Sequence, residues 1–205
     1  MSTNSKERKH SLVRLAGLFG ILGTMLPMIM VLSATVLSSW FRWDTNALSE
    51  LGVGEQALLF NSAVLIGGVL NFLFALGLWQ YLNKEKLVKA GIIAIMFGSI
   101  ALALVGIFTI NYLAWHGVAA FGYFVFAPLG MLLIGFGTKE NKVKKLSIGC
   151  GLSALMFILV LPTIIFGLSL KIGFAVPEET EALIIAVWTL FISAKLTRPK
   201  KDTSG

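Results

Sequence analysis

Three residues of this sequence have side chains that could carry out chemistry together, and they are Ser49, Glu50 and His116. A serine, a carboxylate and a histidine near one membrane face could form a nucleophile and its base, or a proton-linked switch. The alternative is a hydrogen-bonded clamp or a ligand contact. The alternative is favoured, because the surrounding sequence offers no oxyanion hole and no nucleophile elbow.

Metal and cofactor sites receive little support from the sequence. The other histidine, His10, falls on the opposite side of the predicted membrane. A metal site could therefore combine at most one histidine with carboxylates, whereas zinc sites usually contain more histidine ligands. The single cysteine, Cys150, allows neither an intrachain disulfide nor a cysteine metal cluster. We therefore predict no metal and no cofactor.

The elements that must position these residues are predicted to be helices in a membrane. Apolar residues make up 57% of the 205 residues and charged residues only 13%, which is typical of a membrane protein. Uncharged runs recur at the length of about 20 residues that a helix needs to cross a bilayer, and their lack of period-2 alternation argues against a barrel. We predict an all-α, six-helix transmembrane bundle with spans at 15–39, 57–81, 90–110, 117–137, 146–168 and 177–196.

The basic residues predict which side of this bundle is which. The six spans form one membrane domain, 15–196, between basic tails at 1–14 and 197–205, with an outer loop at 40–56. All but two of the 17 basic residues fall on the side of the tails. Because positively charged loops are retained in the cytoplasm, we predict a multi-pass protein of the cell membrane with cytoplasmic N- and C-termini. The net charge of +7 then reflects topology, and no nucleic-acid partner is expected.

The outer loop, which contains the stretch WDTNALSELGVGEQ, is predicted to carry a short helix. Asn46 is a suitable N-cap and Gly52 can end the helix with positive φ. Leu48 and Leu51 fall on one face, so they can plug into the bundle below. A loop that merely joins two spans would not need this pattern, and we predict a lid over the outer end of the bundle.

Two asparagines are the most polar side chains well inside the spans, Asn61 and Asn71. With Gly68 they fall near one stripe of their helix, so this face is predicted to point into the bundle and to bond to a neighbouring helix. The open alternative is a polar lining for a ligand cavity. We expect His116 and Asn61 to hold the lid.

Small residues at four-residue spacing predict where helices pack closely in lipid. The first span offers Ala16, Gly20 and Thr24, and the fifth offers Gly149 and Ser153.

A resemblance to a known family rests on three short motifs. They are the Asn-x-x-Ser-acid-Leu-Gly box at 46–52, the run Phe60-Asn61-Ser62 at the start of the second span, and His116 where the fourth span begins. With these motifs the sequence resembles the uncharacterised membrane family called domain of unknown function 998, found in bacteria and archaea. The resemblance covers nearly the whole chain and implies a similar helix count, but it brings no established activity.

Three classes of function remain, and we rank binding first. An integral protein that binds a lipid-like ligand or a membrane partner at its outer face would use Asn46, Ser49, Glu50, Asn61 and His116 as ligand contacts or as a clamp, with membrane lipids as partners. An intramembrane hydrolase or lipid-modifying enzyme would need Ser49, Glu50 and His116 to be reactive. A small-solute transporter is third, because ionisable groups occur in the spans only at their ends and at Cys150.

Overall fold

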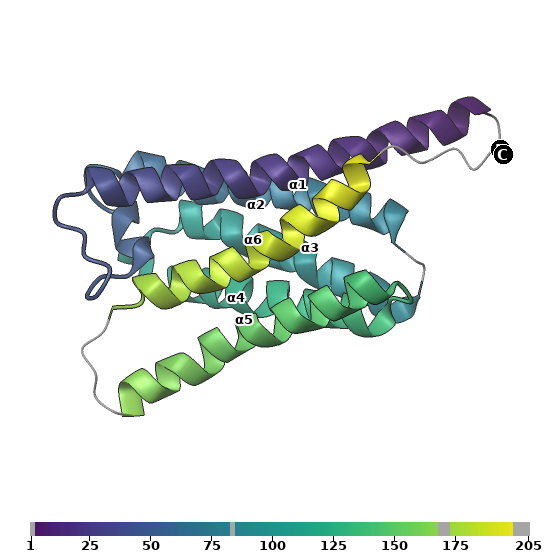
Figure 1. The fold of residues 1–205 in the computed structure, drawn as a ribbon. Helices are drawn as coiled ribbons and strands as arrows, with labels where there is room; N and C mark the ends of the chain where they lie inside the picture. The colour runs from purple at the N-terminus through teal and green to yellow at the C-terminus, as the bar shows by residue number, and fades with distance from the viewer. Residues whose placement is uncertain (1–2, 83–84, 168–172, 199–205) are drawn as a thin grey trace.

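The computed structural model describes residues 3–82, 85–167 and 173–198, with the backbone alone for 3–7, 9 and 158–167. Within these ranges it is all-helical and holds no strand. Six long helices run up and down beside one another (Figure 1), with the short 3-10 helices η1 (Leu48–Gly52) and η2 (Ile110–Tyr112) in two of the connections. The long helices are α1 (Thr3–Leu37), α2 (Ala57–Tyr81), α3 (Lys86–Ile107), α4 (Leu113–Gly137), α5 (Asn141–Gly167) and α6 (Ala175–Thr197).

Five helices in the described part of the chain are long and apolar enough to cross a membrane. They are α1 from His10 onward, α2, α3, the segment 110–137 that includes α4, and α6. The predicted span 146–168 coincides with most of α5, whose side chains are described only as far as Phe157, and residue 168 lies outside the described ranges. The predicted membrane class therefore agrees with the structure over five helices.

Several helices begin before the apolar runs that predicted them. The predicted span 57–81 coincides with α2, but α1 starts at Thr3, so most of the predicted tail 1–14 is helical. Lysine, arginine and glutamate are good helix formers, and a helix can therefore continue past the apolar run that starts it. The 35 residues of α1 are about 52 Å long at the usual rise per residue, and its first part projects beyond the bundle (Figure 1).

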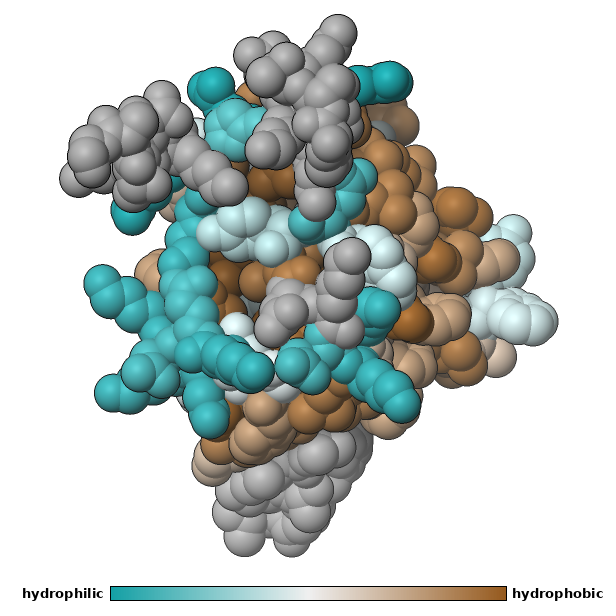
Figure 2. Space-filling model, turned by 90° about the vertical axis from the view of Figure 1, so that its right-hand side faces the viewer, coloured by the Kyte–Doolittle hydropathy of each residue, from teal (hydrophilic) through white to brown (hydrophobic). Residues whose placement is uncertain are grey.

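The surface of the bundle separates apolar flanks from hydrophilic ends. Figure 2 looks onto the end of the bundle where α1 begins and α6 ends, and hydrophilic residues gather there in front of hydrophobic flanks. Large apolar side chains stay exposed along α1, among them Leu18, Leu22, Ile29 and Val36. In water such a continuous apolar surface would be unfavourable, so it fits contact with lipid.

Two clusters of buried apolar residues form the interior. The larger one is centred on Phe74, Leu78, Met131 and Trp188, and the Trp188 indole N–H donates a hydrogen bond to Ser147 Oγ at 2.8 Å. The second cluster joins residues of α1, α2, α3 and α4 to the leucines of η1, namely Leu48 and Leu51. The short helix of the outer loop is thus part of the core.

Close helix packing occurs at some of the predicted small residues but not at others. Gly77 of α2 faces Ala16, and a Cβ on Gly20 would lie 2.7 Å from Cδ2 of Phe74, so this stripe of α1 packs closely on α2. The prediction for Gly149 and Ser153 was wrong, because both are exposed and a Cβ on Gly149 would meet nothing within 4 Å. Spacing alone could not distinguish the exposed side of α5 from its packed side.

Candidate functional site

The 3-10 helix η1, residues 48–52, covers the end of the bundle where α1 ends and α2 begins, and we call it the lid. Leu48 is 7% exposed and Leu51 is 1% exposed, so the prediction that both leucines plug into the bundle is confirmed. Removing these two leucine side chains from solvent stabilises the packing of the lid against the bundle by roughly 1.5–3 kcal/mol each. The lid is therefore a packed element and not a loose connection.

The beginning of the lid is capped by Glu50, and the prediction that Asn46 is the N-cap was wrong. Ala47 occupies the N-cap position, and its backbone N–H donates to Oε1 of Glu50 at 2.8 Å. Asn46 instead donates from Nδ2 to Oε2 of Glu50 at 2.7 Å and accepts from the Arg42 N–H at 2.9 Å. Asn46 thus braces the carboxylate that caps the helix.

The end of the lid also differs from expectation. The glycine with positive φ is Gly54, at 142°, and not Gly52. Gly52 instead allows a close approach to Asn61, since a Cβ at residue 52 would lie 2.7 Å from Oδ1 of Asn61. The side-chain amide of Asn61 donates to the Gly52 carbonyl oxygen at 3.0 Å, so Asn61 bonds to the lid and not to a neighbouring span.

The second asparagine bonds between spanning helices, as expected for its face. Asn71 Nδ2 donates to the carbonyl oxygen of Gly23 in α1 at 3.0 Å and to that of Gly67 in its own helix at 2.9 Å. In an apolar interior a buried amide without a partner would be costly. Asn71 therefore links α2 to α1.

A carboxylate from the last helix also holds the lid. Oε2 of Glu178 accepts a hydrogen bond from the Leu48 N–H at 2.7 Å. Two backbone hydrogen bonds also join the loop before the lid to the start of α6. The Gly173 N–H donates to the Asp44 carbonyl oxygen at 2.8 Å, and the Ala175 N–H donates to the Asn46 carbonyl oxygen at 2.9 Å. The sequence alone did not indicate this bond, because nothing local in the chain pairs Glu178 with residue 48.

His116 is buried, with 6% exposure, at the start of α4. Its Nδ1 lies 2.7 Å from the carbonyl oxygen of Phe108. A carbonyl can only accept, so Nδ1 carries the proton, and in the neutral ring Nε2 is an unprotonated acceptor. His116 therefore holds the connection from α3 to α4 in place.

A cavity of about 140 Å³, which we call the first cavity, lies beneath the lid between α1, α2, α3, α4 and α6. Polar side chains line the end beneath the lid, namely Ser49 of the lid, His116, and the carboxylates Glu178 and Glu179, and Thr24, Asn71, Tyr123 and Thr189 line the cavity elsewhere. Its walls are mostly apolar and include Met28, Val31, Val64, Leu102, Val105 and Ile185. The combination of a mostly apolar lining with a small number of polar groups is typical of a site for a small molecule.

The cavity brings together only part of the predicted site. Ser49 and His116 both line it, but Glu50 does not, and both Glu50 oxygens accept hydrogen bonds around the lid. No hydrogen bond joins Ser49 to His116 in the described part of the chain. Among those same residues there is also no group of three or more His, Cys, Asp or Glu side chains placed to hold a metal ion.

An exposed ion pair lies at the solvent edge of the outer loop. The Arg42 guanidinium contacts the Asp44 carboxylate at 2.9 Å. Its hydrogen bonds lower the pKa of Asp44 and, reciprocally, raise the pKa of Arg42. Both side chains are solvent-exposed, so the pair contributes little to stability.

Comparison with known proteins yields one match. A family model described as "Protein of unknown function (DUF998)" matches residues 21–195, which covers all six long helices at least in part. No curated protein and no solved structure matches the chain.

Proposed function

The chain belongs to the DUF998 family, whose function is unknown, and we propose that it is a multi-pass membrane protein that binds a lipid-like ligand in the first cavity. The family match and the five apolar helices are compatible with an integral membrane protein.

The observation that carries the proposal is the polarity of the first cavity. Along α6 its lining runs from Glu178 to Thr189, which corresponds to about 16 Å of helix. An alkyl chain can occupy the apolar length, while a polar head group stays at the lid end beside Ser49, His116 and Glu178. A small hydrophilic solute would gain little from such walls, so transport is less well supported.

The residues of the lid divide into two roles in this proposal. Ser49, His116 and Glu178 line the cavity and would contact the head group. Asn46, Glu50 and Asn61 hold the lid through hydrogen bonds and would set the shape of the entrance. The ligand would enter beside the lid from the outer leaflet.

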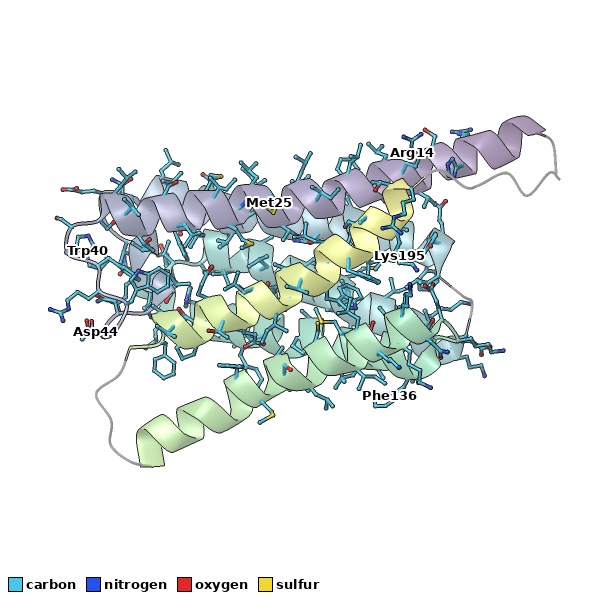
Figure 3. The ribbon with its side chains drawn as sticks, viewed as in Figure 1. Arg14, Met25, Trp40, Asp44, Phe136 and Lys195 are labelled. Carbon is cyan, nitrogen blue, oxygen red and sulfur yellow. The ribbon has the colours of Figure 1, made fainter. Side chains whose placement is uncertain are left out.

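The membrane orientation is part of the same proposal, with six spans and both termini in the cytoplasm. Figure 3 labels Arg14 and Lys195 at one end of the bundle and Trp40 and Asp44 at the other. The basic residues at the first end favour a cytoplasmic location, and aromatic residues at the second suit a membrane interface. The lid would then face the outside of the cell.

A cavity-filling substitution tests the proposal directly. Ala182→Phe places a ring in the first cavity, whereas Leu183→Phe adds one at a neighbouring position that is 43% exposed. Binding of a photoreactive fatty-acyl amphiphile in maltoside detergent should be lost in the first variant and kept in the second. Full labelling of a folded Ala182→Phe variant would contradict the proposal.

A second candidate is a hydrolase or lipid-modifying enzyme, because Ser49 and His116 line one cavity. In this case Nε2 of His116 would act as the base and the Phe108 carbonyl, bonded to Nδ1, would orient the ring. Glu50 would have no part in the chemistry because its oxygens cap the lid. Ester hydrolysis that Ser49→Ala abolishes would favour this candidate over binding.

A further inference from the structure

A second cavity, of about 180 Å³, adjoins the first between α4, α5 and α6. It shares Ala120, Phe124 and Glu178 with the first cavity, so the two meet at this wall. It lies near the end of the bundle where α6 begins, and there α5 diverges from α6 (Figure 1). Its lining differs from that of the first cavity in being rich in aromatic rings.

An unpartnered carboxylate lines this second cavity. Glu181 is 1% exposed, and its Oε1 is buried without a hydrogen-bond partner among the described residues. The described lining contains no lysine, arginine or histidine that could balance it. Burial of a polar oxygen without a partner is costly, and carboxylates within membrane spans usually mark a functional site.

The other lining residues identify the kind of partner that would compensate this cost. Four phenylalanines, Phe121, Phe124, Phe157 and Phe174, accompany the carboxylates of Glu178 and Glu181. The faces of aromatic rings carry negative electrostatic potential and attract ammonium groups, and rings of this kind form the cages that bind alkylated ammonium. A bare metal cation would instead require about six oxygen ligands, and two carboxyl groups supply too few.

We propose that the second cavity binds an organic ammonium group, with Glu181 and Glu178 supplying negative charge and the phenylalanine rings contacting the alkyl substituents. The ammonium group could belong to a free alkylammonium ion or to the head of a lipid-like ligand whose chain lies in the first cavity. In the second case the inference rests on the proposed function, and in the first it stands alone.

Binding of matched probes to the whole protein in uncharged maltoside detergent tests this inference. Tetramethylammonium represents the free ion, and hexyltrimethylammonium represents the lipid-like form. A hexyl compound with carbon in place of the nitrogen provides the neutral control, and sodium chloride controls for ionic strength. Calorimetric titration should give at least tenfold weaker binding of the neutral compound than of hexyltrimethylammonium.

Two variants assign the binding to the second cavity. Glu181→Gln keeps the shape of the side chain but removes its charge, and Phe157→Leu removes an aromatic face while keeping an apolar wall. Each should weaken binding of the ammonium probes by at least tenfold. The controls are Glu55→Gln on the exposed outer loop and Phe126→Leu, which is 40% exposed and pairs with Phe97; both should bind as the natural protein does.

The outcomes separate this inference from the proposed function. Equal affinity for charged and neutral hexyl compounds, unaffected by Glu181→Gln and Phe157→Leu, would overturn the ammonium site and leave lipid-like binding standing. Binding of tetramethylammonium that depends on Glu181, together with failure of every amphiphile to bind, would support the site and contradict the proposed function. Much tighter binding of hexyltrimethylammonium than of tetramethylammonium would identify the lipid-like source.

Discussion

Glu178 accepts a hydrogen bond from the backbone N–H of Leu48 at 2.7 Å, although 130 positions separate the two residues in the chain. The bond joins the last spanning helix to the lid. It also places Glu178 between the lid, the first cavity and the second cavity, since it lines both. A substitution of Glu178 should therefore affect both the position of the lid and the lining of the two cavities beneath it.

Glu178→Ala should loosen the lid. The Leu48 N–H would lose its acceptor, at a cost of about 1–3 kcal/mol for a buried donor left unsatisfied. Hydrogen exchange of the Leu48 amide in detergent should become faster, while Glu55→Ala, on the exposed part of the loop, should leave it unchanged. An equally protected Leu48 amide in Glu178→Ala would show that the bond does not hold the lid.

Asn61→Leu should destabilise the protein through the lid. The substitution removes the hydrogen bond to the Gly52 carbonyl, which is worth about 0.5–1.5 kcal/mol. Thermal unfolding in detergent should occur at a lower temperature, and exchange of amides 48–52 should accelerate more than that of amides in α5. The idea fails if stability is unchanged and the lid amides stay protected.

Gly52→Ala should be destabilising, in contrast to Gly149→Ala. A Cβ at residue 52 would meet Oδ1 of Asn61 at 2.7 Å, so the Asn61 side chain, which is bonded to the Gly52 carbonyl, would have to shift. At residue 149 nothing lies within 4 Å, and alanine in a helix is favoured over glycine by up to about 1 kcal/mol. Melting temperatures of the two variants should move in opposite directions, and a stabilised Gly52→Ala would contradict the described packing.

Ser49→Ala distinguishes a binding protein from an enzyme. The Ser49 side chain makes no hydrogen bond among the described residues, so its removal should change the free energy of unfolding by less than about 0.5 kcal/mol. If the cavity only binds, the variant should retain amphiphile binding within a few-fold. An ester amphiphile cleaved by the natural protein but not by Ser49→Ala would count against the binding function.

Cysteine labelling in cells tests the orientation. In a Cys150→Ala background, Thr45→Cys lies on the exposed outer loop and Asn141→Cys on the exposed opposite end. A membrane-impermeant maleimide should label Thr45→Cys in intact cells, and Asn141→Cys only after permeabilisation. The reverse pattern would place the lid in the cytoplasm.

Local patterns were enough to predict most of the helices and part of the lid. Uncharged runs of sufficient length predicted α2 to its last residue, since a backbone in lipid must bond to itself within each segment. The three-residue spacing of Leu48 and Leu51 predicted their burial, because that spacing puts both side chains on one face. Helix ends were less well predicted, as at α1, where polar residues extend the helix beyond the apolar run.

The composition of the candidate site depended on contacts between distant segments. The sequence by itself determined that the chain is a helical membrane protein and that residues 46–52 form a special element in the loop before α2, since hydropathy and short-range spacing act within one helix or turn. Only the tertiary structure decided that Glu178 holds the lid and that Glu181 is buried among phenylalanines. The physical reason is that the partner of a buried polar group is whichever group the packing of six helices brings within about 3 Å of it, and that choice is not encoded by neighbours in the chain.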